Sequence, residues 1–421
     1  MTDGAPDFQQ ARLLAYSCGQ SLTCSVDVVS VRSDFGTVPP AQGIPQFLAA
    51  DIHARNDVPV ADCSAMDGYA VAGPPPWRFA GEALPGEANP VSLEPGTAIR
   101  VGTGSVIPNG TEAVVRWEDV ESRQAWRQAG PDPGLTLGAM GAPKPPDGDN
   151  IRRSGEETRL AERIGVSGQL LTSSLRGAAA AAGLDELQVA RPPRIALLAT
   201  GDELQDSGVP SASKIRDALT PTLRSLLPAM GAGIGTACLV PDSRDAAQDA
   251  LLAADSAAII LSTGMASAGP RDYMRDVLAD LGAEMVIDNV QIRPGRPQGL
   301  AILPDGRMVA LLPGNPFAAI SAMVTIVQPL IAGALRASLP AIRAVARHGS
   351  VPKPGAVTRL YPARWSTPTE QTAGPAEPSA LGIARLDILP WRGSAQLRGL
   401  AEAEALLIVP PTGEPGYLPL P

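Results

Sequence analysis

The middle of the chain alternates apolar runs with helical patterns. Four runs are continuous enough to be buried strands: Arg194–Gly201, Gly233–Val240, Ala257–Gly264 and Glu284–Val290. Helical patterns follow them or lie between them, at 218–230, 243–256, 270–282 and 316–336. Strands that alternate with helices of about 10–15 residues are typical of βαβ units. The pattern therefore predicts a doubly wound α/β domain with a mostly parallel sheet over residues 191–337.

The regions on either side have other patterns. Residues 51–147 are rich in proline and glycine and contain short β-like runs such as Ala98–Gly104, which predicts a small β domain. Residues 150–188 contain helix formers and a glycine stop, which predicts a helical segment. After about residue 340 the chain is proline-rich with short β runs, which predicts a terminal β domain.

One apolar stretch has nearly the length of a membrane span. Phe317–Leu335 contains no charged residue over 19 positions. It also contains Ser321, Thr325 and Gln328, and Asn315-Pro316 before it are good N-cap and N1 residues. We therefore expect a buried helix of a soluble domain rather than a membrane span.

Composition narrows the class of protein. The 421 residues include 43 Gly and 43 Pro, and 44% are hydrophobic, which excludes wholesale disorder, a collagen repeat and a long coiled coil. A net charge of −9 argues against a general nucleic-acid binder. With four scattered cysteines and two histidines, a Cys/His metal site and a disulfide framework are not expected. The first ten residues show no signal-peptide pattern, so we expect a cytoplasmic protein.

The ends of two predicted strands are candidate ligand sites. In a parallel α/β sheet, ligands bind at the carboxyl ends of the strands. Thr200-Gly201 and Ser262-Thr263-Gly264 put small side chains and backbone N–H groups where an anion could approach, although tight βα turns need glycine too. Asp202 and Glu203 follow the first of these strands, where they could bind a cation or cap a helix.

Two proline-bracketed segments also suggest anion binding. Arg293-Pro-Gly-Arg296-Pro holds two guanidinium groups close together, which suits phosphate, although a surface turn with solvated arginines would have the same sequence. Pro313-Gly-Asn-Pro316 begins the long apolar helix and could present N–H groups or simply cap that helix.

In the predicted β domain, three segments are of interest. Asp67 stands among small residues in Ser64–Ala70, and Thr103-Gly104 is a possible anion loop, although each alone is an ordinary turn signal. Asp149–Glu157 mixes arginines and glutamates, which usually marks a solvated face. Taken together, the segments suggest a phosphate-bearing ligand and a carboxylate-held cation, for which Mg²⁺ is the hard cation of choice.

In this order, the motifs resemble the molybdopterin molybdenumtransferase (MoeA) family, to which the E domain of gephyrin is related. The matching strings cover residues 10–336 well and the C-terminal part more weakly: Asp62–Val71, Thr103-Gly104, Asn150–Glu156, Pro193–Leu204, Asp272-Tyr273, Arg293–Pro297 and Leu312–Pro316. The resemblance implies four parts: a helical linking part (8–50 plus 148–190), an inserted β domain (51–147), the central α/β domain (191–337) and a C-terminal β-barrel-like domain (340–421).

The resemblance also implies an activity and a set of site residues. The family inserts molybdate into adenylylated molybdopterin with release of AMP, using a divalent cation such as Mg²⁺. Its homodimer builds each cleft from the central domain of one chain and the β domain of the other. By motif match, the catalytic positions are Asp67, Thr103, Glu203 and Asp217. The ligand-binding positions are Ser262, Gly264, Asp272, Arg293, Arg296, Pro313 and Pro316, and the metal ligands are Glu203, Asp217 and Asp242.

Several positions depart from the family motifs. They are Glu157 for Asp, Ala218-Leu219 for a polar pair, Ser243 for the second of two aspartates, the altered loop Ser262–Gly269, Asn289 for lysine, and Arg293 and Arg296 for two lysines. The two arginines fit the chain's general use of arginine, because it has only three lysines among its 34 basic residues. The other changes leave a second hypothesis open, a non-catalytic paralogue that binds molybdopterin or its cofactor as a carrier or partner protein.

Overall fold

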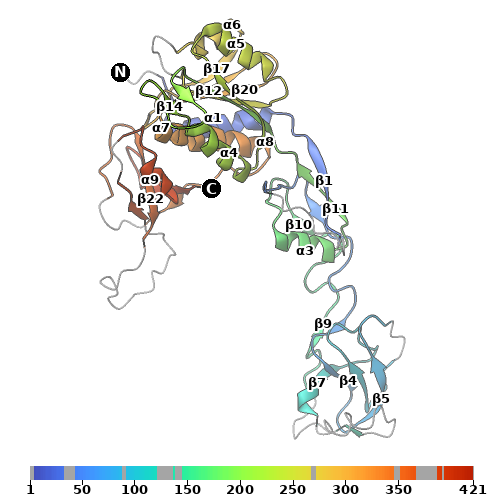
Figure 1. Ribbon diagram of the computed structural model, residues 1–421. Helices are drawn as coiled ribbons and strands as arrows, with labels where there is room; N and C mark the ends of the chain where they lie inside the picture. The colour runs from blue at the N-terminus through green and yellow to red at the C-terminus, as the bar shows by residue number, and fades with distance from the viewer. Residues whose placement is uncertain are drawn as a thin grey trace.

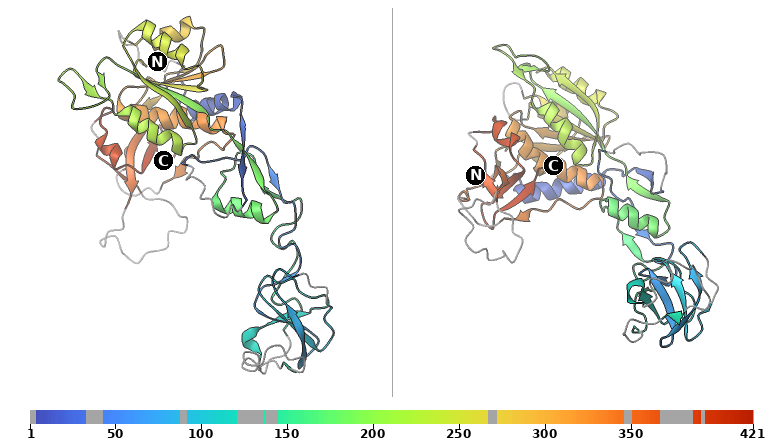
Figure 2. Two further views of the ribbon diagram at one scale, coloured as in Figure 1. Left: turned by 45° about the vertical axis from the view of Figure 1, so that its right-hand side comes forward. Right: turned by 60° about the horizontal axis from the view of Figure 1, so that its bottom comes forward.

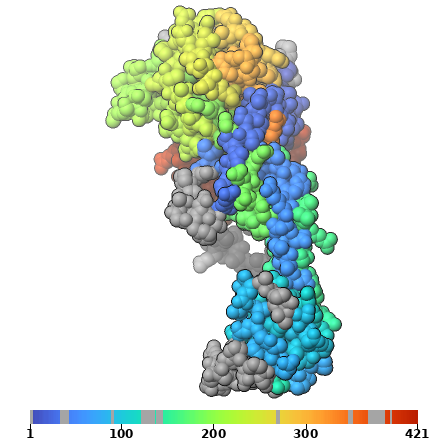
Figure 3. Space-filling model, turned by 90° about the vertical axis from the view of Figure 1, so that its right-hand side faces the viewer, coloured from blue at the N-terminus to red at the C-terminus, as the bar shows by residue number. Residues whose placement is uncertain are grey.

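The molecule is elongated, with a mixed α/β body at one end and a β domain at the other. The computed structural model describes residues 4–32, 43–87, 92–120, 136–137, 145–266, 272–345, 351–366, 386–390 and 393–420. A narrow part connects the two ends (Figures 1 and 2), and the side view in Figure 3 shows the β domain projecting well away from the body.

A six-stranded sheet forms the centre of the body. Its strand order is β15 (Gly233–Val240), β12 (Arg194–Thr200), β16 (Ile259–Thr263), β20 (Met308–Leu312), β19 (Gly299–Ile302) and β17 (Glu284–Asp288). The first four strands are parallel, whereas β19 runs antiparallel to both of its neighbours. The sheet is therefore mixed, and the four apolar runs of the sequence analysis include neither β19 nor β20.

Helices pack on both faces of this sheet because alternate strand residues point to opposite sides. On β12, Ile195 and Leu197 join one core, and Ala196 and Leu198 join the other. The first core also takes in α1 (Phe8–Ser21), α4 (Leu219–Ala229), α7 (Pro316–Ala322), the π-helical turn Met323–Val327 and α8 (Gln328–Ala334). The second takes in α5 (Arg244–Ala253) and α6 (Met274–Asp280).

The apolar stretch is a buried core helix, as predicted. Pro316–Ala334 has a mean hydropathy of 1.8 and would be long enough to cross a membrane, yet nearly all of it is buried inside the body. Its π-helical turn ends just before Pro329, which lacks an N–H and crowds the preceding turn. The buried Arg12 of α1 donates to the carbonyl of Val324 in this turn.

Helix α1 lies in the body, which differs from the predicted division. Residues 8–50 were assigned to the helical linking part, but Phe8, Ala11 and Ala15 are buried in the first core. Gly19 and Gly333 allow α1 and α8 to approach closely, since a Cβ on Gly19 would lie 2.1 Å from the Leu330 carbonyl oxygen. A pattern read along the chain does not show which distant surface a helix covers.

The connecting part is small and contains more strand than helix. It holds two antiparallel pairs and one helix: β1 (Val26–Ser30) with β11 (Glu186–Ala190), β2 (Ile52–His53) with β10 (Arg163–Gly165), and α3 (Ser173–Ala181). Leu48, Leu175 and Leu187 contribute to its own core.

The β domain is built on a five-stranded sheet with an apolar core on each face. Its order is β7 (Ala113–Arg116), β4 (Gly68–Ala72), β6 (Thr97–Val101), β5 (Trp77–Ala83) and β8 (Thr136–Leu137). Tyr69 and Val71 face one core, and Ala70 and Ala72 face the other. At the base, β3 (Cys63–Ser64) pairs with β9 (Ile151–Arg152), and a 3₁₀ turn at Trp117–Asp119 follows β7.

A second sheet lies beside α7 and contains the C-terminal strands. Its order is β18 (Ile292–Arg293), β22 (Thr358–Trp365), β24 (Ala405–Val409), β25 (Gly416–Pro419) and β21 (Arg343–Ala344), and β23 (Leu386–Ile388) also pairs with β22. The short helix α9 (Arg398–Ala401) precedes β24. Because β18 comes from the middle of the chain, Arg293 lies in this sheet and not in the central one. The short parallel pair β13 (Leu204–Gln205) and β14 (Ile215–Arg216) projects from the body (Figure 2).

Candidate functional site

The carboxyl ends of three parallel strands are tied together in the body. Thr200 Oγ1 at the end of β12 donates to the Thr263 carbonyl of β16 at 2.8 Å, and Gly264 N donates to the Leu312 carbonyl of β20 at 3.0 Å. Gly264 has φ +87°, and a Cβ there would lie 2.6 Å from Thr200 Oγ1. Glycine is therefore required by both the conformation and the close approach.

These turns do not offer the N–H groups that the sequence suggested. Gly201 N donates to the Val240 carbonyl at 3.3 Å, and Gly264 N is used as described above. Ser262 is fully buried within β16, and its hydroxyl finds no hydrogen-bond partner among the described residues. The tight-turn interpretation therefore fits the two glycines, and Ser262 is an interior residue and not a surface ligand.

Two aspartates face each other where β12 and β15 end. Asp202 N donates to Asp242 Oδ2 at 3.3 Å, and Asp242 N donates to Asp202 Oδ1 at 3.1 Å. Lys214, near β14, donates to the Asp202 carbonyl. Glu203 folds back over Gly201, since a Cβ on that glycine would lie 2.8 Å from Glu203 Oε2. Three carboxylates and one ammonium group therefore lie near the carboxyl ends of β12 and β15.

The predicted metal set of Glu203, Asp217 and Asp242 does not form a preformed cage. Asp217 Oδ1 accepts from Leu219 N and Thr220 N, both at 3.0 Å, so this oxygen caps the start of α4. Among the described residues, no three His, Cys, Asp or Glu side chains stand close enough together to hold a metal ion. Asp242 instead faces Asp202, which the motif match did not include among the metal ligands.

The proline-bracketed segments meet at the start of α7. Arg293 and Arg296 are exposed, and Gly295 between them packs so closely that a Cβ would lie 2.9 Å from the Ala318 carbonyl oxygen. Pro313 is buried and Pro316 is half-buried at the first position of α7. Asp272 is half-buried just before α6. Two arginines are thus held beside the Pro313–Pro316 turn by backbone packing.

Asp67 and Thr103 form a second cluster, in the β domain. Thr103 donates to Asp67 Oδ1 from its backbone N at 2.7 Å and from Oγ1 at 2.9 Å. These two hydrogen bonds hold the pKa of Asp67 below its usual value. Gly68 is the first residue of β4, where it pairs with Arg116 of β7, and is not part of a turn. Glycine is needed there because a Cβ would lie 2.1 Å from the Val115 carbonyl oxygen.

The two clusters lie at opposite ends of the molecule. Figures 1 and 2 show the β domain, which carries Asp67 and Thr103, separated from the central sheet by the connecting part. The structure therefore brings Glu203 and Asp242 to one site and Asp67 and Thr103 to another, and does not bring all four together within one chain.

Two family models match this chain, one over its N-terminal region and one over its central domain. The profile described as MoeA N-terminal region (domain I and II) matches residues 26–183, and that of a probable molybdopterin binding domain matches residues 196–333. The chain is 31% identical over 338 residues to the molybdopterin molybdenumtransferase of Synechococcus elongatus, covering 76% of this chain and 80% of that protein. The chain belongs to the molybdopterin molybdenumtransferase family.

Other members of the family agree with this assignment. The molybdopterin molybdenumtransferase of Haemophilus influenzae is 32% identical over 294 residues, covering 68% of this chain and 70% of the relative. The solved structure of the molybdopterin biosynthesis moeA protein from Pyrococcus horikoshii OT3 superposes with a TM-score of 0.75 over 99% of this chain and 98% of that one, at 21% identity. The family's mixed α/β multidomain fold is therefore the fold of this chain.

Three departures from the family motifs have local structural explanations. Ser243 caps α5, because its side chain accepts from Ala246 N at 3.2 Å. Glu157 pairs with Arg152 at 3.0 Å. Leu219 is buried at the start of α4 within the main core. Of the altered Ser262–Gly269 loop, residues 267–269 lie outside the described residues.

Reasoning from sequence missed two residues of the body cluster. Asp202 was considered, with Glu203, as a cation ligand or a helix cap but was not carried into the predicted site, and Lys214 was not considered as a site residue. The adjacency of Asp202 to Glu203 was the available signal. Its pairing with Asp242 depends on the parallel register of β12 and β15, which places Thr200 opposite Val240.

Proposed function

We propose that this chain is a molybdopterin molybdenumtransferase that inserts molybdate into adenylylated molybdopterin and releases AMP. The observation that carries the proposal is the 31% identity to a molybdopterin molybdenumtransferase over 80% of that protein's length. Acidic residues at the carboxyl edge of the central α/β sheet, and two exposed arginines on a segment that packs against α7, support it. The chain thus acts in molybdenum cofactor biosynthesis.

Each part of the site has a task in this reaction. The exposed guanidinium groups of Arg293 and Arg296 bind and orient the phosphate groups of the substrate, since guanidinium matches phosphate geometry. Because Gly295 packs against α7, the two arginines are held in place before the substrate arrives. Positive charge near the phosphates also stabilises the charge that develops as the phosphoanhydride bond breaks.

The acidic residues fit a Mg²⁺ ion that is held in part by the substrate. Mg²⁺ is usually bound through one or two carboxylates, waters and substrate phosphates, not in an all-protein cage. Asp202 and Asp242 supply two carboxylates that face each other, so these two residues would hold the ion together with the substrate. When bound, the ion would polarise a phosphoryl oxygen. Asp217 caps α4 through Oδ1, and its role as a ligand stays a prediction from the motif match.

Completing the site requires a second copy of the chain. Asp67 and Thr103 lie too far from the central sheet to join Asp242 within one chain. A homodimer in which the β domain of one copy reaches the central domain of the other would complete the site, as the family resemblance implies. We also expect the enzyme to be cytoplasmic.

Release of AMP tests the proposal. Purified protein given adenylylated molybdopterin, molybdate and Mg²⁺ should release AMP. Asp242→Asn should lower kcat/KM by about 10–100-fold, as loss of a residue that supports a metal site typically does. Asp245→Asn, an exposed residue three positions away on α5, is the matched control and should leave the rate unchanged.

The outcome distinguishes a transferase from a non-catalytic carrier of molybdopterin. Tight binding of molybdopterin by a folded wild-type protein, with no AMP release above background, would support the non-catalytic carrier. The comparisons do not favour that alternative, because relatives that match about two thirds or more of this chain carry a transferase name.

A further inference from the structure

Two passages of chain connect the β domain to the rest of the molecule. Residues 51–62 lead out and residues 154–167 return beside them (Figure 1). Backbone hydrogen bonds join the passages, for example from Val58 N to the Thr158 carbonyl at 2.8 Å and from Gly155 N to the Pro59 carbonyl at 3.0 Å. The orientation of the β domain is therefore set along this paired segment.

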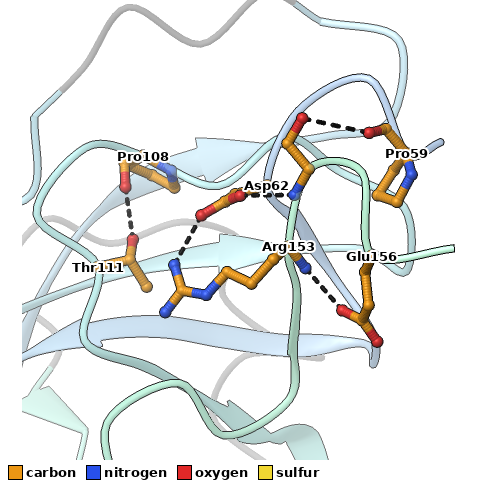
Figure 4. A network of polar contacts seen from close by, with 7 residues as sticks. Pro59, Asp62, Pro108, Thr111, Arg153 and Glu156 are labelled. Carbon is orange, nitrogen blue, oxygen red and sulfur yellow. Dashed lines mark hydrogen bonds and ion pairs between the residues drawn. The ribbon is translucent and has the colours of Figure 1, made fainter. Parts of the chain in front are cut away.

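At the outer end of the paired segment, Asp62 accepts two hydrogen bonds from the returning passage (Figure 4). Ser154 N donates to Asp62 Oδ1 at 2.8 Å, and Arg153 Nη1 donates to Asp62 Oδ2 at 2.6 Å. Glu156 Oε2 in turn accepts from Arg153 N at 2.8 Å. The charged residues of the Asp149–Glu157 segment are exposed, as its charge pattern predicted, and Arg153 and Ser154 of this segment also hydrogen-bond to Asp62.

The residues that follow Asp62 support the Asp67–Thr103 pair. Ile107 N donates to the Asp62 carbonyl at 3.1 Å, Ser64 N donates to the Ser105 carbonyl at 2.9 Å, and Gly104 N donates to the Ser64 carbonyl at 2.8 Å. The loop that carries Thr103 is therefore hydrogen-bonded to Asp62 and Ser64. Asp67 follows Ser64 by three residues on the same segment.

We propose that Asp62 is a positioning residue for the Asp67–Thr103 pair, held in place by Ser154 and Arg153. The proposal rests on the proposed function, in which that pair completes the active site of a second copy. Fixing Asp62 fixes both the segment that leads into Asp67 and the loop that carries Thr103. Asp62 does not itself touch the substrate.

Asp51 is a matched control at the inner end of the same paired segment. Ser167 N donates to Asp51 Oδ1 at 2.8 Å, and Arg163 Nη1 pairs with Asp51 Oδ2 at 3.2 Å. The exposed fractions of the two aspartate side chains are alike, 36% for Asp62 and 39% for Asp51. Asp51 thus has the same chemistry as Asp62 but is remote from the Asp67–Thr103 pair.

The experiment compares Asp62→Ala, Asp62→Asn and Asp51→Ala in the full-length protein. Asp62→Ala should lower kcat/KM by about 100-fold, the scale expected for a displacement of about 1 Å in a site. Asp62→Asn keeps an oxygen that accepts from Ser154 N and loses only an exposed ion pair, so it should retain most activity. Asp51→Ala should match the wild type.

A second readout does not depend on turnover. The pKa of Asp67, measured by NMR titration of its side-chain carboxyl carbon, should rise in Asp62→Ala as the hydrogen bonds from Thr103 lengthen. It should stay at the wild-type value in Asp51→Ala. Arg100 of β6 is the other charged group that acts on Asp67, and none of these variants alters it.

The two readouts separate failure of the proposal from failure of the proposed function. If the wild-type protein releases no AMP, the proposed function fails and the NMR comparison still tests Asp62. A folded Asp62→Ala variant with unchanged Asp67 titration, or an equal change in Asp51→Ala, would overturn the positioning role. If Asp62→Ala does not fold, Asp62→Leu carries the same test, because leucine keeps the bulk of the side chain but accepts no hydrogen bond from Ser154 N. A wild-type Asp67 titration in that variant overturns the proposal.

Discussion

A carboxylate and a hydroxyl 36 positions apart meet in the β domain because of strand register. Gly68 pairs with Val101 at the edge of the antiparallel β4–β6 pair, so Asp67 and Thr103 lie just beyond the same end. Both donors on Thr103 then point to one oxygen of Asp67. The pair is therefore set by backbone geometry, and its hydrogen bonds favour the ionised carboxylate.

Removing the Thr103 hydroxyl should raise the pKa of Asp67. In Thr103→Val the backbone donor remains and the side-chain donor is lost, so the pKa should move part of the way back to its usual value. Because the folded pKa is lowered, ionised Asp67 stabilises the fold above the unfolded pKa of about 3.9, and this contribution is lost as pH falls through the folded pKa.

Two measurements check that shift. Carboxyl NMR titration should show the higher pKa directly, and the free energy of unfolding should rise less between pH 2 and 5 in Thr103→Val than in the wild type. The control is Thr111→Val, whose hydroxyl donates to the Pro108 carbonyl at 2.7 Å in the same domain (Figure 4). An equal shift in the control would contradict the assignment.

Single residues could be selected from the sequence when a motif carried them, but their contacts could not. Asp67 and Thr103 were each predicted as catalytic positions, and the structure brings them into hydrogen-bond contact. Asp217 was predicted as a metal ligand, and its Oδ1 caps α4 instead. An aspartate that precedes a helix has the same local sequence in either role, and only its neighbours in space distinguish the two.

Helices α1 and α8 cross so closely that two positions in the contact admit no side chain. A Cβ on Gly333 would lie 2.2 Å from the Tyr16 carbonyl oxygen, and one on Gly19 would meet the backbone of α8. The atoms in contact are backbone atoms, so no side chain can move aside. The two helices can approach this closely because both positions are glycine.

Gly333→Ala should therefore destabilise the body. Overpacking a close contact costs about 1–3 kcal/mol, and sometimes more, and here the helices themselves would have to separate. Gly177→Ala on the exposed side of α3 is the control, because no atom lies within 4 Å of the added Cβ. Helix propensity predicts that this change stabilises α3 by about 1 kcal/mol.

Hydrogen exchange measures the effect locally. Amides of α1 and α8 should exchange faster in Gly333→Ala and at the wild-type rate in Gly177→Ala. Unchanged protection of α1 in Gly333→Ala would show that the helices do not cross as closely as described.

Hydrophobic periodicity predicted the elements of the body better than their arrangement. The runs at 194–201 and 257–264 became β12 and β16, and the stretch at 316–336 became the buried helix. Strand β19 was missed because its four residues lack any flanking helix that would mark a βαβ unit. The position of α1 depends on Gly333 in α8, over 300 residues later, which no local pattern reports.

For the whole molecule, the separation of the two clusters makes a prediction about mixed dimers. Asp67→Asn and Asp242→Asn should each retain about a tenth of wild-type activity or less when alone. If each site uses the β domain of one copy and the central domain of the other, refolding the two variants together should restore activity. Random pairing makes half of the dimers mixed, each with one intact site, so about a quarter of wild-type activity is expected.

The control for this experiment is a pair of variants from the same cluster. Mixing Asp202→Asn with Asp242→Asn should restore nothing, because both changes lie in the central domain. The measurement is AMP release after co-refolding and isolation of the dimer. Equal rescue in both mixtures would show that the two clusters are not shared between copies.

The overall shape could not be derived from the chain's own pattern. Composition and periodicity indicated several parts, but not that a paired segment would hold the β domain away from the body. That geometry arises from backbone hydrogen bonds between the two passages, such as the one from Val58 N to the Thr158 carbonyl, which join residues about 100 positions apart.

The packing of α1 has a consequence for folding during synthesis. Arg12 contacts Val324, which lies 312 positions later in the chain. At about 5–20 residues per second, a ribosome needs about 15–60 s to make that stretch. During this interval the apolar side of α1, with Phe8, Ala11 and Ala15, has no partner to cover it. The nascent chain should therefore bind chaperones through its first helix, and be released when α8 leaves the exit tunnel.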